Sequence, residues 1–442
     1  ASTSCPRSLS PVNDTNAPLI FNSIIDSMRQ FGESLHHNGM SLFLAHVPKG
    51  TEFYRGTVNK KTVKHLQWLA FEPEHALGVV RGRQQNKTTS YLQTYRTRSA
   101  LRLIYIDGQS AAKSTKGVLD TQDIIIRDPN KPKPPPPPGG LPPGAMGDSE
   151  RAAEMCQVAA KTWKGRIDGV IRMQGGFEVI LCSNIFKLRI VSVDVLDPSI
   201  KQNVMNFYLA IAARYDGIGD HRVDLDYDSM VSLYAYPDLV YIDKNGLPRA
   251  NVHSKSLSKA KSDLRATAMS RSKAGHDWQA IGDMFVARYG DKIQYLASGN
   301  VKTLSDLHTQ VDLAAEPFVN FRDPDQNDEI WACARQFWPE DLRFYFWCPM
   351  LLNVPAAAFR GVAFRVCEAF VNARKATDLN KAVNDFKTLE KWLDWASFKT
   401  CRGCAYNAVC MPPIWPWGNK QDFLQPQCRT SLDGLMGGKD WY

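Results

Sequence analysis

The sequence has no long apolar run and no complete signature of a metalloprotease or serine hydrolase. No stretch approaches the roughly 18 uninterrupted apolar residues that a membrane span requires. The nine histidines form no H-E-x-x-H or comparable pair, so a catalytic metal is not expected. Gly108 and Ser110 resemble the start of a G-x-S-x-G elbow, but Ala112 stands where the last glycine belongs. Metalloproteases of the H-E-x-x-H type and serine hydrolases of the G-x-S-x-G type are therefore disfavoured. No resident metal or cofactor is expected.

The composition is that of a soluble globular protein. Hydrophobic residues make up 44% of the 442 residues, and charged residues make up 22%. A chain of this length exceeds what one hydrophobic core usually organises. We therefore expect at least two domains, in an oligomeric state that the sequence does not define.

Cysteines and sequons predict an extracellular protein. The ten cysteines are an even number, and N-x-[ST] sequons at Asn13 and Asn86 stand in polar surroundings suited to glycans. The chain begins ASTSCPRSLSPV, which is typical of a mature end left after removal of a secretory signal. We expect a secreted glycoprotein, extracellular or associated with the cell wall, with most cysteines in disulfides.

The C-terminal cysteines allow two interpretations. Four thiolates at Cys401, Cys404, Cys410 and Cys428 would satisfy a tetrahedral zinc ion. In a secreted chain the same spacing more often makes disulfides in a short coil that has too little core to fold unaided. Disulfides are the favoured interpretation, although the sequence does not define their connectivity.

The positive charge is concentrated near the N-terminus. Residues 1–135 hold 18 Lys and Arg against 10 Asp and Glu, and the rest of the chain is nearly balanced. Six basic residues and no acidic residue lie between Arg81 and Arg102. Such a surface attracts an anionic small molecule, an acidic polysaccharide or, less favourably, a nucleic acid. A basic face that serves only solubility is the alternative.

Periodicity predicts an α+β protein in three parts. Residues 1–198 are rich in strand patterns and predict a mixed, mostly antiparallel sheet domain with a Pro-rich loop at 129–147. Residues 199–400 carry apolar side chains at i, i+3, i+4 and i+7, which predicts a mainly helical domain. Residues 401–442 are expected to form a disulfide-stapled tail packed on the helical domain.

Two strand-like blocks carry the candidate catalytic side chains. In GTEFYRGT, Arg55 projects from a strand and suits a phosphate or carboxylate, while Gly56 lets a ligand approach the backbone. In GGFEVILC, Glu178 lies within an apolar strand, where an unpaired carboxylate is costly. Glu178 is therefore an acid–base or electrostatic catalyst, a residue facing water at a sheet edge, or the partner of an arginine such as Arg172.

The order of YRGT on an early strand, AFEPEHA running into a helix, two further strands and FEVIL on a late strand resembles the ADP-ribosyltransferase superfamily. The resemblance covers about residues 45–182 and implies a split, mostly antiparallel sheet that binds NAD as substrate. It implies that Arg55 holds the dinucleotide, that Gly56 lets the nicotinamide approach, and that Glu178 stabilises the ribosyl cation. Tyr54 or Tyr95 would stack on the nicotinamide. The other expected ligand-binding residues are Phe71 and Arg96.

Two departures from that pattern change the expected reaction. Ala70, Phe71 and Glu72 stand where the Arg-type members carry Ser-Thr-Ser. Gly176 replaces the acidic or Gln residue two positions before the catalytic Glu, a residue common in transferases that modify arginine. NAD hydrolysis or a lost activity is therefore favoured over protein modification.

The whole chain also resembles a group of secreted proteins of filamentous fungi. The blocks that carry this likeness are WLAFEPEHA, LRLIYIDGQSAAK, GVLDTQD, DGVIRMQGGFEVILC and CRGCAYNAVC with PPIWPWG. The likeness implies secretion and a shared fold but no particular substrate.

Two further functions stay open. The carboxylates Asp107, Asp120, Asp123 and Asp168 could join Glu178 as the acid pair of a glycoside hydrolase acting on a cell-wall polysaccharide. Aspartates also recur at strand ends and turns for local hydrogen bonding. The sheet domain could alternatively be a surface binding module or effector without turnover.

Overall fold

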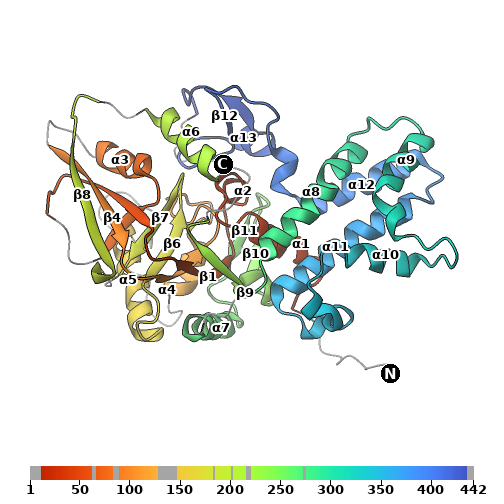
Figure 1. Cartoon of the computed structure of the whole chain (residues 1–442), viewed down its shortest axis with the longest axis horizontal. Coiled ribbons are helices and arrows are strands. Elements are labelled where there is room, and N and C mark those ends of the chain that lie inside the picture. The colour runs from red at the N-terminus through yellow and green to blue at the C-terminus, as the bar shows by residue number, and fades with distance from the viewer. Residues whose placement is uncertain are drawn as a thin grey trace. The chain divides into compact units, whose positions relative to one another are not determined.

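The computed structural model describes residues 11–61, 66–82, 89–127, 147–182, 185–200, 203–215, 221–271 and 275–435. The chain forms two compact units, each assembled from two separate stretches. The helical unit comprises Ala1–Ile25 and Gly275–Thr400, and the sheet unit comprises Asp26–Ala274 and Cys401–Tyr442. Figure 1 labels many of the helices and strands of both units.

The sheet unit is built on nine strands in the order β8-β4-β2-β3-β7-β6-β5-β1-β9. Neighbouring strands run antiparallel except for the parallel pair β5 and β6. The strands are β1 (Ser41–Val47), β2 (Glu52–Thr57), β3 (Gln67–Ala70), β4 (Ser90–Thr97), β5 (Leu101–Ile106), β6 (Gly169–Met173), β7 (Phe177–Leu181), β8 (Leu188–Leu196) and β9 (Asp224–Ser232).

The sheet is weakly joined between β2 and β3. Strand β2 pairs with β4 along its whole length, from Glu52 to Thr57. Within the described residues β2 meets β3 at one register position, Tyr54 opposite Ala70. The two strands diverge beyond that pair, so the sheet is split next to the YRGT motif.

Alternation along the strands divides the core into two layers. Side chains at every second position form one layer with the helices α4 (Asp120–Ile126), α5 (Asp148–Gln157) and α7 (Leu257–Met269). This layer includes Leu42, Leu44, Ile104, Ile106, Val170 and Ile180 from the strands and Ile125, Met155 and Leu264 from the helices. The opposite face carries aromatic rings in contact: Phe43 with Tyr105, Tyr105 with Phe177, and Phe53 with Phe71.

Other helices and two small sheets complete this unit. Helix α3 (Pro73–Gly82) packs against β2 and against α6 (Val204–Tyr215), which also contacts α2 (Gln30–Leu35). A five-residue π-helical turn, Val158–Thr162, follows α5. The small sheets are β10 (Val240–Ile242) with β11 (Pro248–Ala250), and β12 (Val409–Met411) with β13 (Gln427–Arg429), beside α13 (Lys420–Leu424).

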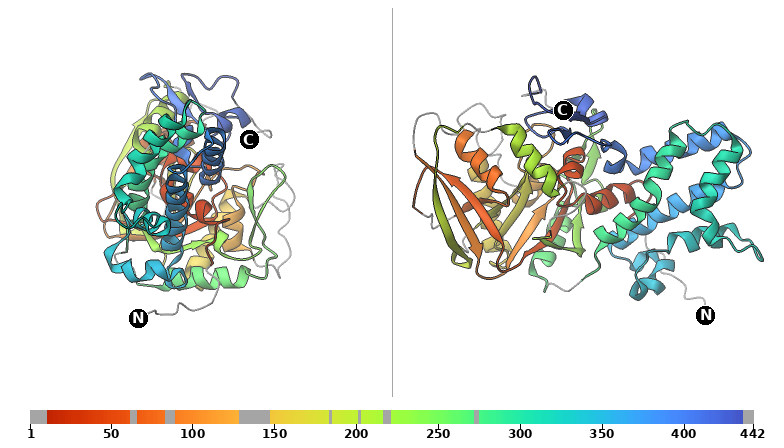
Figure 2. Two further views of the ribbon diagram at one scale, coloured as in Figure 1. Left: turned by 90° about the vertical axis from the view of Figure 1, so that its right-hand side faces the viewer. Right: turned by 45° about the horizontal axis from the view of Figure 1, so that its top comes forward.

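The helical unit begins with the first helix of the chain. Its helices are α1 (Ala17–Ile25), α8 (Trp278–Ala297), α9 (Leu304–Ala315), α10 (Gln326–Ala334), α11 (Val354–Ala373) and α12 (Leu379–Leu393). Helix α1 packs against α11 and α8, and α12 packs against α8 (Figure 1, Figure 2). Phe21, Phe285, Phe359 and Trp395 meet ring to ring in the core.

Side-chain caps explain where these helices begin. An Asp, Asn or Thr stands immediately before five of them and accepts a hydrogen bond from a first-turn backbone N–H group, which satisfies an otherwise unpaired donor. These cap residues are Asp277, Thr303, Asp325, Asn353 and Asp378.

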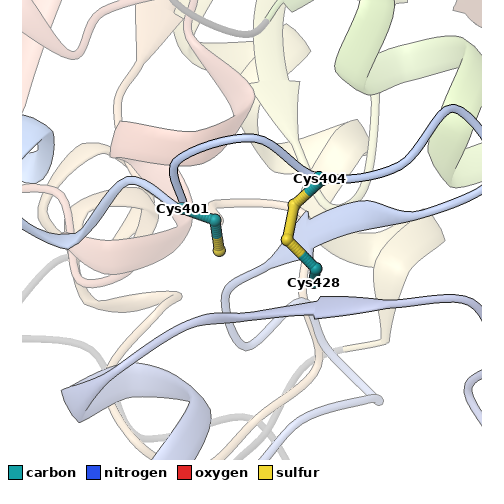
Figure 3. Close-up of side chains that lie close together, drawn as sticks. All are labelled: Cys401, Cys404 and Cys428. Atoms are coloured by element: carbon teal, nitrogen blue, oxygen red, sulfur yellow. A yellow bond between two sulfur atoms is a disulfide. The ribbon is translucent and has the colours of Figure 1, made fainter.

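The C-terminal segment is cross-linked by disulfides, as predicted. Cys401 is bonded to Cys410, and Cys404 to Cys428. Figure 3 shows the sulfurs of Cys401, Cys404 and Cys428 gathered together, with a bond joining the last two. Because all three sulfurs are in disulfide bonds, they are not thiolates available to zinc.

Disulfides also lie in both units outside this segment. Cys156 is bonded to Cys182 in the sheet unit, and Cys333 to Cys367 in the helical unit. Cys348 is disulfide-bonded as well. The prediction that most cysteines form disulfides is confirmed.

The predicted fold class is confirmed: a mixed, mostly antiparallel sheet, a mainly helical region and a disulfide-rich C-terminal segment. The units nevertheless divide the chain differently from the predicted boundaries at 198/199 and 400/401. Residues 199–274 join the sheet unit because β9 pairs with β1. The C-terminal segment joins it because Gln109 donates to Pro413 O at 2.6 Å and accepts from Trp415 N at 3.0 Å.

Two predicted features lie outside the described residues, the sequon at Asn86 and the Pro-rich loop up to residue 146. In the part of the chain that is described, none of the helices combines the length and the apolar character that crossing a membrane would need.

Candidate active site

A cleft of about 510 Å³ lies where β2 and β3 diverge. Its walls come from residues 54–58 on one side of the split and 66–70 on the other. The start of α3, the first residues of α5, and strands β6 and β7 complete it. The cleft therefore brings together residues of YRGT, AFEPEHA and FEVIL, the three motifs that carry the sequence resemblance.

Glu178 lines this cleft and is held by a buried arginine. Arg172 lies opposite Glu178 in the antiparallel register, and its Nε donates to Glu178 Oε1 at 2.7 Å. Arg172 is almost fully buried, whereas the Glu178 side chain keeps 14% of its surface exposed. The structure thus contains the Arg172 partnership that the sequence left open, and it leaves the carboxylate accessible from the cleft.

The same arginine also binds a second carboxylate of the cleft wall. Arg172 Nη1 lies 2.9 Å from Asp148 Oδ1 at the start of α5, and Lys113 Nζ lies 3.2 Å from Asp148 Oδ2. Burial raises the pKa of Asp148, but Arg172 and Lys113 outweigh it and the net pKa is lowered. Burial opposes the charge on Arg172, yet Glu178 and Asp148 together raise its pKa. Lys113, Asp148, Arg172 and Glu178 thus form a row of four side chains of alternating charge, in which two positive groups face two carboxylates.

Arg55 contributes to the cleft wall, but its side chain follows the other face of the sheet. Tyr54 and Glu178 each lie opposite Ala70, so these three share a face, and Arg55, one residue along, has the opposite orientation. Its Nη1 donates to Gln93 Oε1 at 3.1 Å. The structure therefore brings Arg55 and Glu178 into one cleft wall without directing them toward each other.

Tyr54 and Gly56 lie on the Glu178 side. Tyr54 lines the cleft, and its hydroxyl donates to Glu52 Oε2 at 3.3 Å. A Cβ atom at Gly56 would lie 2.0 Å from Ala76 O and 2.9 Å from Val80. The glycine is thus explained by the close packing of α3 on β2, which is a reason the sequence did not reveal.

The other expected ligand-binding residues have partners within the protein. Phe71 is fully buried against Phe53, with the Arg222 guanidinium 5.2 Å from its ring centroid. Tyr95 is buried, and its hydroxyl donates to Gln93 Oε1 at 2.8 Å. Arg96 Nε donates to Glu52 Oε1 at 3.0 Å. These residues lie in or beside the split sheet, but they are not among the residues that line the cleft.

The four alternative carboxylates lie elsewhere and are engaged locally. Asp107 accepts from Ser41 N at 2.7 Å, and Asp168 accepts from Arg102 N at 2.9 Å and from Lys187 at 2.7 Å. Asp120 accepts from Arg249 Nε at 2.8 Å, and Asp123 from Arg151 at 2.7 Å. None of the four lines the cleft that contains Glu178. Asn13 uses its amide oxygen to accept from Thr15 N at 2.9 Å in a local turn.

The sequence did not single out His75, which lines the cleft from the first turns of α3. Its ring centroid lies 5.7 Å from that of Phe207, and Glu178 is among the charges that act on it. His75 belongs to the AFEPEHA motif, but a lone histidine carries no spacing signal. Only the pairing of β3 with β7 reveals that the helix after β3 begins beside Glu178.

A comparison with known proteins finds a family model that matches the N-terminal part of the chain. Residues 7–85 and 78–213 match the family model described as the YPL277C N-terminal domain. The chain is 31% identical over 205 residues to the Saccharomyces cerevisiae protein named "Uncharacterized protein YOR389W", and 31% identical over 206 residues to "Uncharacterized protein YPL277C" of the same yeast. The stretches that the family model matches include both sides of the cleft.

Each of these two alignments covers only part of this chain and part of the yeast protein. Each covers 38% of this chain, and they cover 31% and 40% of the two yeast proteins. No solved structure matches the chain. The comparisons support the predicted likeness to a fungal protein family, and the printed names assign no activity to it.

Proposed function

We propose that the sheet unit binds an NAD-like anionic ligand in the cleft between β2 and β3 and cleaves or transfers at its glycosidic bond. Glu178 would face the ribosyl carbon and stabilise the positive charge that develops there as the bond breaks. The observation that carries this proposal is the adjacency of β2, β3 and β7, which gathers the three motif strands around one split in the sheet and one cleft.

The environment of Glu178 supports an electrostatic role. Its Oε1 atom is fixed by Arg172, and within the described residues no hydrogen bond reaches its Oε2 atom. A carboxylate that is oriented by one oxygen and open at the other is arranged to meet a developing cation at low reorganisation cost. Arg172 would act as the positioning residue for that carboxylate, because its guanidinium is almost fully buried.

A glycoside hydrolase with a carboxylate pair is less well supported. Asp148 is the second carboxylate of the cleft, but its net pKa is lowered by Arg172 and Lys113 against the opposing effect of burial. A general acid of a glycosidase needs a raised pKa so that it holds a proton at neutral pH. Asp148 is therefore a poor proton donor, and a nucleotide ligand remains the better candidate.

The test uses the purified full chain with NAD at millimolar concentration. Wild-type protein should consume NAD and show a raised melting temperature, and Glu178→Gln should lower the turnover by about 100-fold or more. Gln retains an acceptor oxygen for Arg172 Nε but leaves only Asp148 to compensate the buried guanidinium, so the melting temperature without ligand should fall, and each variant is assayed well below its own melting temperature. Glu340→Gln is the matched control, because that side chain is 85% exposed in the helical unit.

Other outcomes identify the alternatives. Release of reducing sugar from a cell-wall polysaccharide, without any response to NAD, would replace this proposal with the hydrolase. No turnover of either substrate and no melting shift would indicate a binding module or effector.

We also propose that the protein is secreted. The disulfides in both units support an oxidising compartment, since such bonds are rare where glutathione keeps thiols reduced. Detection of glycosylated protein in the culture medium of an expressing fungus would support this, and exclusive recovery from the cytosol would contradict it.

A further inference from the structure

His75 lies against the turn that leads into the strand of Glu178. It stands in the first half of α3 and lines the same cleft as Glu178. A Cβ atom built on Gly176 would lie 3.1 Å from His75 Nδ1 and 3.6 Å from its Cγ. The imidazole therefore occupies the space into which a side chain at position 176 would extend.

Gly176 does not owe its identity to backbone conformation, because it is not among the positive-φ glycines of the described chain. A larger residue is disfavoured instead by the His75 ring, whereas Ile211 Cγ2, 3.5 Å from the added Cβ atom, would be in ordinary contact. The absence of a side chain at 176 and the presence of the imidazole are thus two parts of one arrangement. That arrangement places the titratable ring of His75 beside Gly176, which precedes Glu178 by two positions in the sequence.

We infer that His75 is the base that accepts the proton of the attacking water or acceptor hydroxyl when the glycosidic bond is cleaved. This inference rests on the proposed function of the cleft. It assigns the stabilisation of the cation and the activation of the nucleophile to two different side chains, Glu178 and His75, on two different elements.

The proposed step balances without a further reactant. The bond between the ribosyl carbon and the nicotinamide nitrogen breaks, and its electron pair neutralises the pyridinium charge. The oxygen of water forms a bond to the same carbon, and one water proton passes to a ring nitrogen of His75. The imidazolium then releases that proton to solvent, so the net products are ADP-ribose, nicotinamide and a proton.

The electrostatic surroundings favour a neutral imidazole that is ready to accept a proton. Burial is the main effect that lowers the pKa of His75, and Arg172 lowers it further. Glu178, Glu72 and a contact with the Phe177 backbone act in the opposite direction, and the net pKa is lowered. A neutral histidine at neutral pH is the form that general-base catalysis requires.

The experiment compares His75→Gln with Glu178→Gln in the full chain, by steady-state NAD turnover as a function of pH and by the melting shift with NAD. We expect His75→Gln to lower kcat by about 100-fold, to leave KM and the NAD-induced melting shift nearly unchanged, and to abolish the acid limb of the wild-type kcat profile. His253→Gln is the control, because His253 is exposed and is not part of the cleft lining.

A second variant tests the geometry without removing the imidazole. Gly176→Ala adds a Cβ atom beside Nδ1 and must displace the ring by a few tenths of an ångström. We expect kcat to fall several-fold while KM is kept. Because the alanine is compatible with the backbone, this variant remains informative if His75→Gln does not fold.

The outcomes separate this inference from the proposal on which it rests. In one outcome wild-type protein consumes NAD, Glu178→Gln abolishes turnover, and both His75→Gln and Gly176→Ala retain the wild-type kcat and pH profile. The role inferred for His75 would then be wrong, and the proposed function of the cleft would stand. If His75→Gln loses the NAD-induced melting shift together with turnover, the residue serves ligand binding or packing only. Wild-type protein that neither binds nor consumes NAD overturns both.

Discussion

Arg172 shows how a single residue can serve packing and chemistry together. It is buried between Glu178 and Asp148, and each carboxylate makes the burial of the guanidinium less costly. Removing one carboxylate from a buried ion pair destabilises the fold by more than the intact pair stabilises it, because the guanidinium charge is then left uncompensated. The acidic partners are therefore tied to the fold as well as to the cleft.

Glu33 is a buried carboxyl group that does not line the cleft. Its oxygens accept hydrogen bonds from the Tyr105 hydroxyl and from Gly108 N. Burial is the main reason that the pKa of Glu33 is raised well above its usual value, and Asp107 and Asp26 raise it further. The folded state thus favours the protonated form more than the unfolded state does.

The raised pKa of Glu33 predicts a stability that falls as the pH rises. A group whose folded pKa is above its unfolded value contributes fully below the unfolded pKa, and the contribution is lost as pH rises through the folded pKa. The loss amounts to at most about 1.4 kcal/mol per pH unit for one proton. Glu33→Gln should flatten the dependence of the unfolding free energy on pH above the ordinary titration range of a glutamic acid, measured by urea denaturation.

The exposed Glu340→Gln variant provides the control for this measurement. If the slope of wild-type protein and that of Glu33→Gln coincide over the same range, Glu33 is not the group responsible.

At the scale of secondary structure, the packing of α3 on β2 is the contact that shapes the cleft. Gly56 allows the helix to approach until Ala76 O lies where a Cβ atom would be. Helix α3 in turn carries His75, Ala76 and Val80, which line the cleft. A change at Gly56 should therefore act on stability and on the cleft at once.

We expect Gly56→Ala to lower the free energy of unfolding by about 1–3 kcal/mol, because overpacking forces backbone movement. Gly290→Ala is a matched control in α8, where an added Cβ atom would lie 3.6 Å from Val286 Cγ1 and 3.8 Å from Trp395 Cε3, both ordinary contacts. That change should be neutral or stabilising, since alanine favours a helix over glycine by about 1 kcal/mol. Equal melting temperatures for the two variants would contradict the packing argument.

Local sequence patterns predicted which segments form strands and helices better than they predicted which of these segments pair with one another. The alternation in LRLIYID and FEVILC marks β5 and β7 because each strand has one face in a continuous core. The pairing of β9 with β1 joins residues about 180 positions apart, and no local period encodes it. His75 and Gly176 meet for the same reason, because the first turn of α3 lies against the turn before β7.

The candidate site was predictable in part. Glu178 was identifiable because a carboxylate in an apolar strand requires a partner, and Arg172 supplies one across the strand pair. The reason for Gly56 was not identifiable, because close approach to a ligand and close approach to a helix demand the same residue. Asp148 follows the Pro-rich loop and had no signal at all, since its partners lie on β6 and in the loop after β5.

At the scale of the whole molecule, the C-terminal segment completes the sheet unit through few but specific contacts. Gln109 is buried and hydrogen-bonds to both Pro413 and Trp415, and Gln174 of the cleft wall donates to Trp415 O at 3.3 Å. The disulfides restrain this segment, which contains little other regular structure. Loss of a disulfide should therefore loosen the segment before it unfolds the sheet.

We predict that the double change Cys404→Ser and Cys428→Ser lowers the free energy of unfolding by about 2–5 kcal/mol. Limited proteolysis followed by mass spectrometry should find the first cleavages between residues 401 and 435, where the wild-type protein resists. First cleavage within the helical unit would show that the disulfide does not protect the C-terminal segment.

The chain enters the helical unit with α1, leaves it at Ile25 and returns at Gly275. During synthesis on the ribosome, α1 emerges long before its partner α11, which is completed only at Ala373. Ile20, Phe21 and Ile24, all buried in the finished protein, must wait without their native neighbours while the sheet strands are made. The order of translation therefore favours a protein whose strands assemble first, and it makes α1 the segment for which a chaperone would matter most.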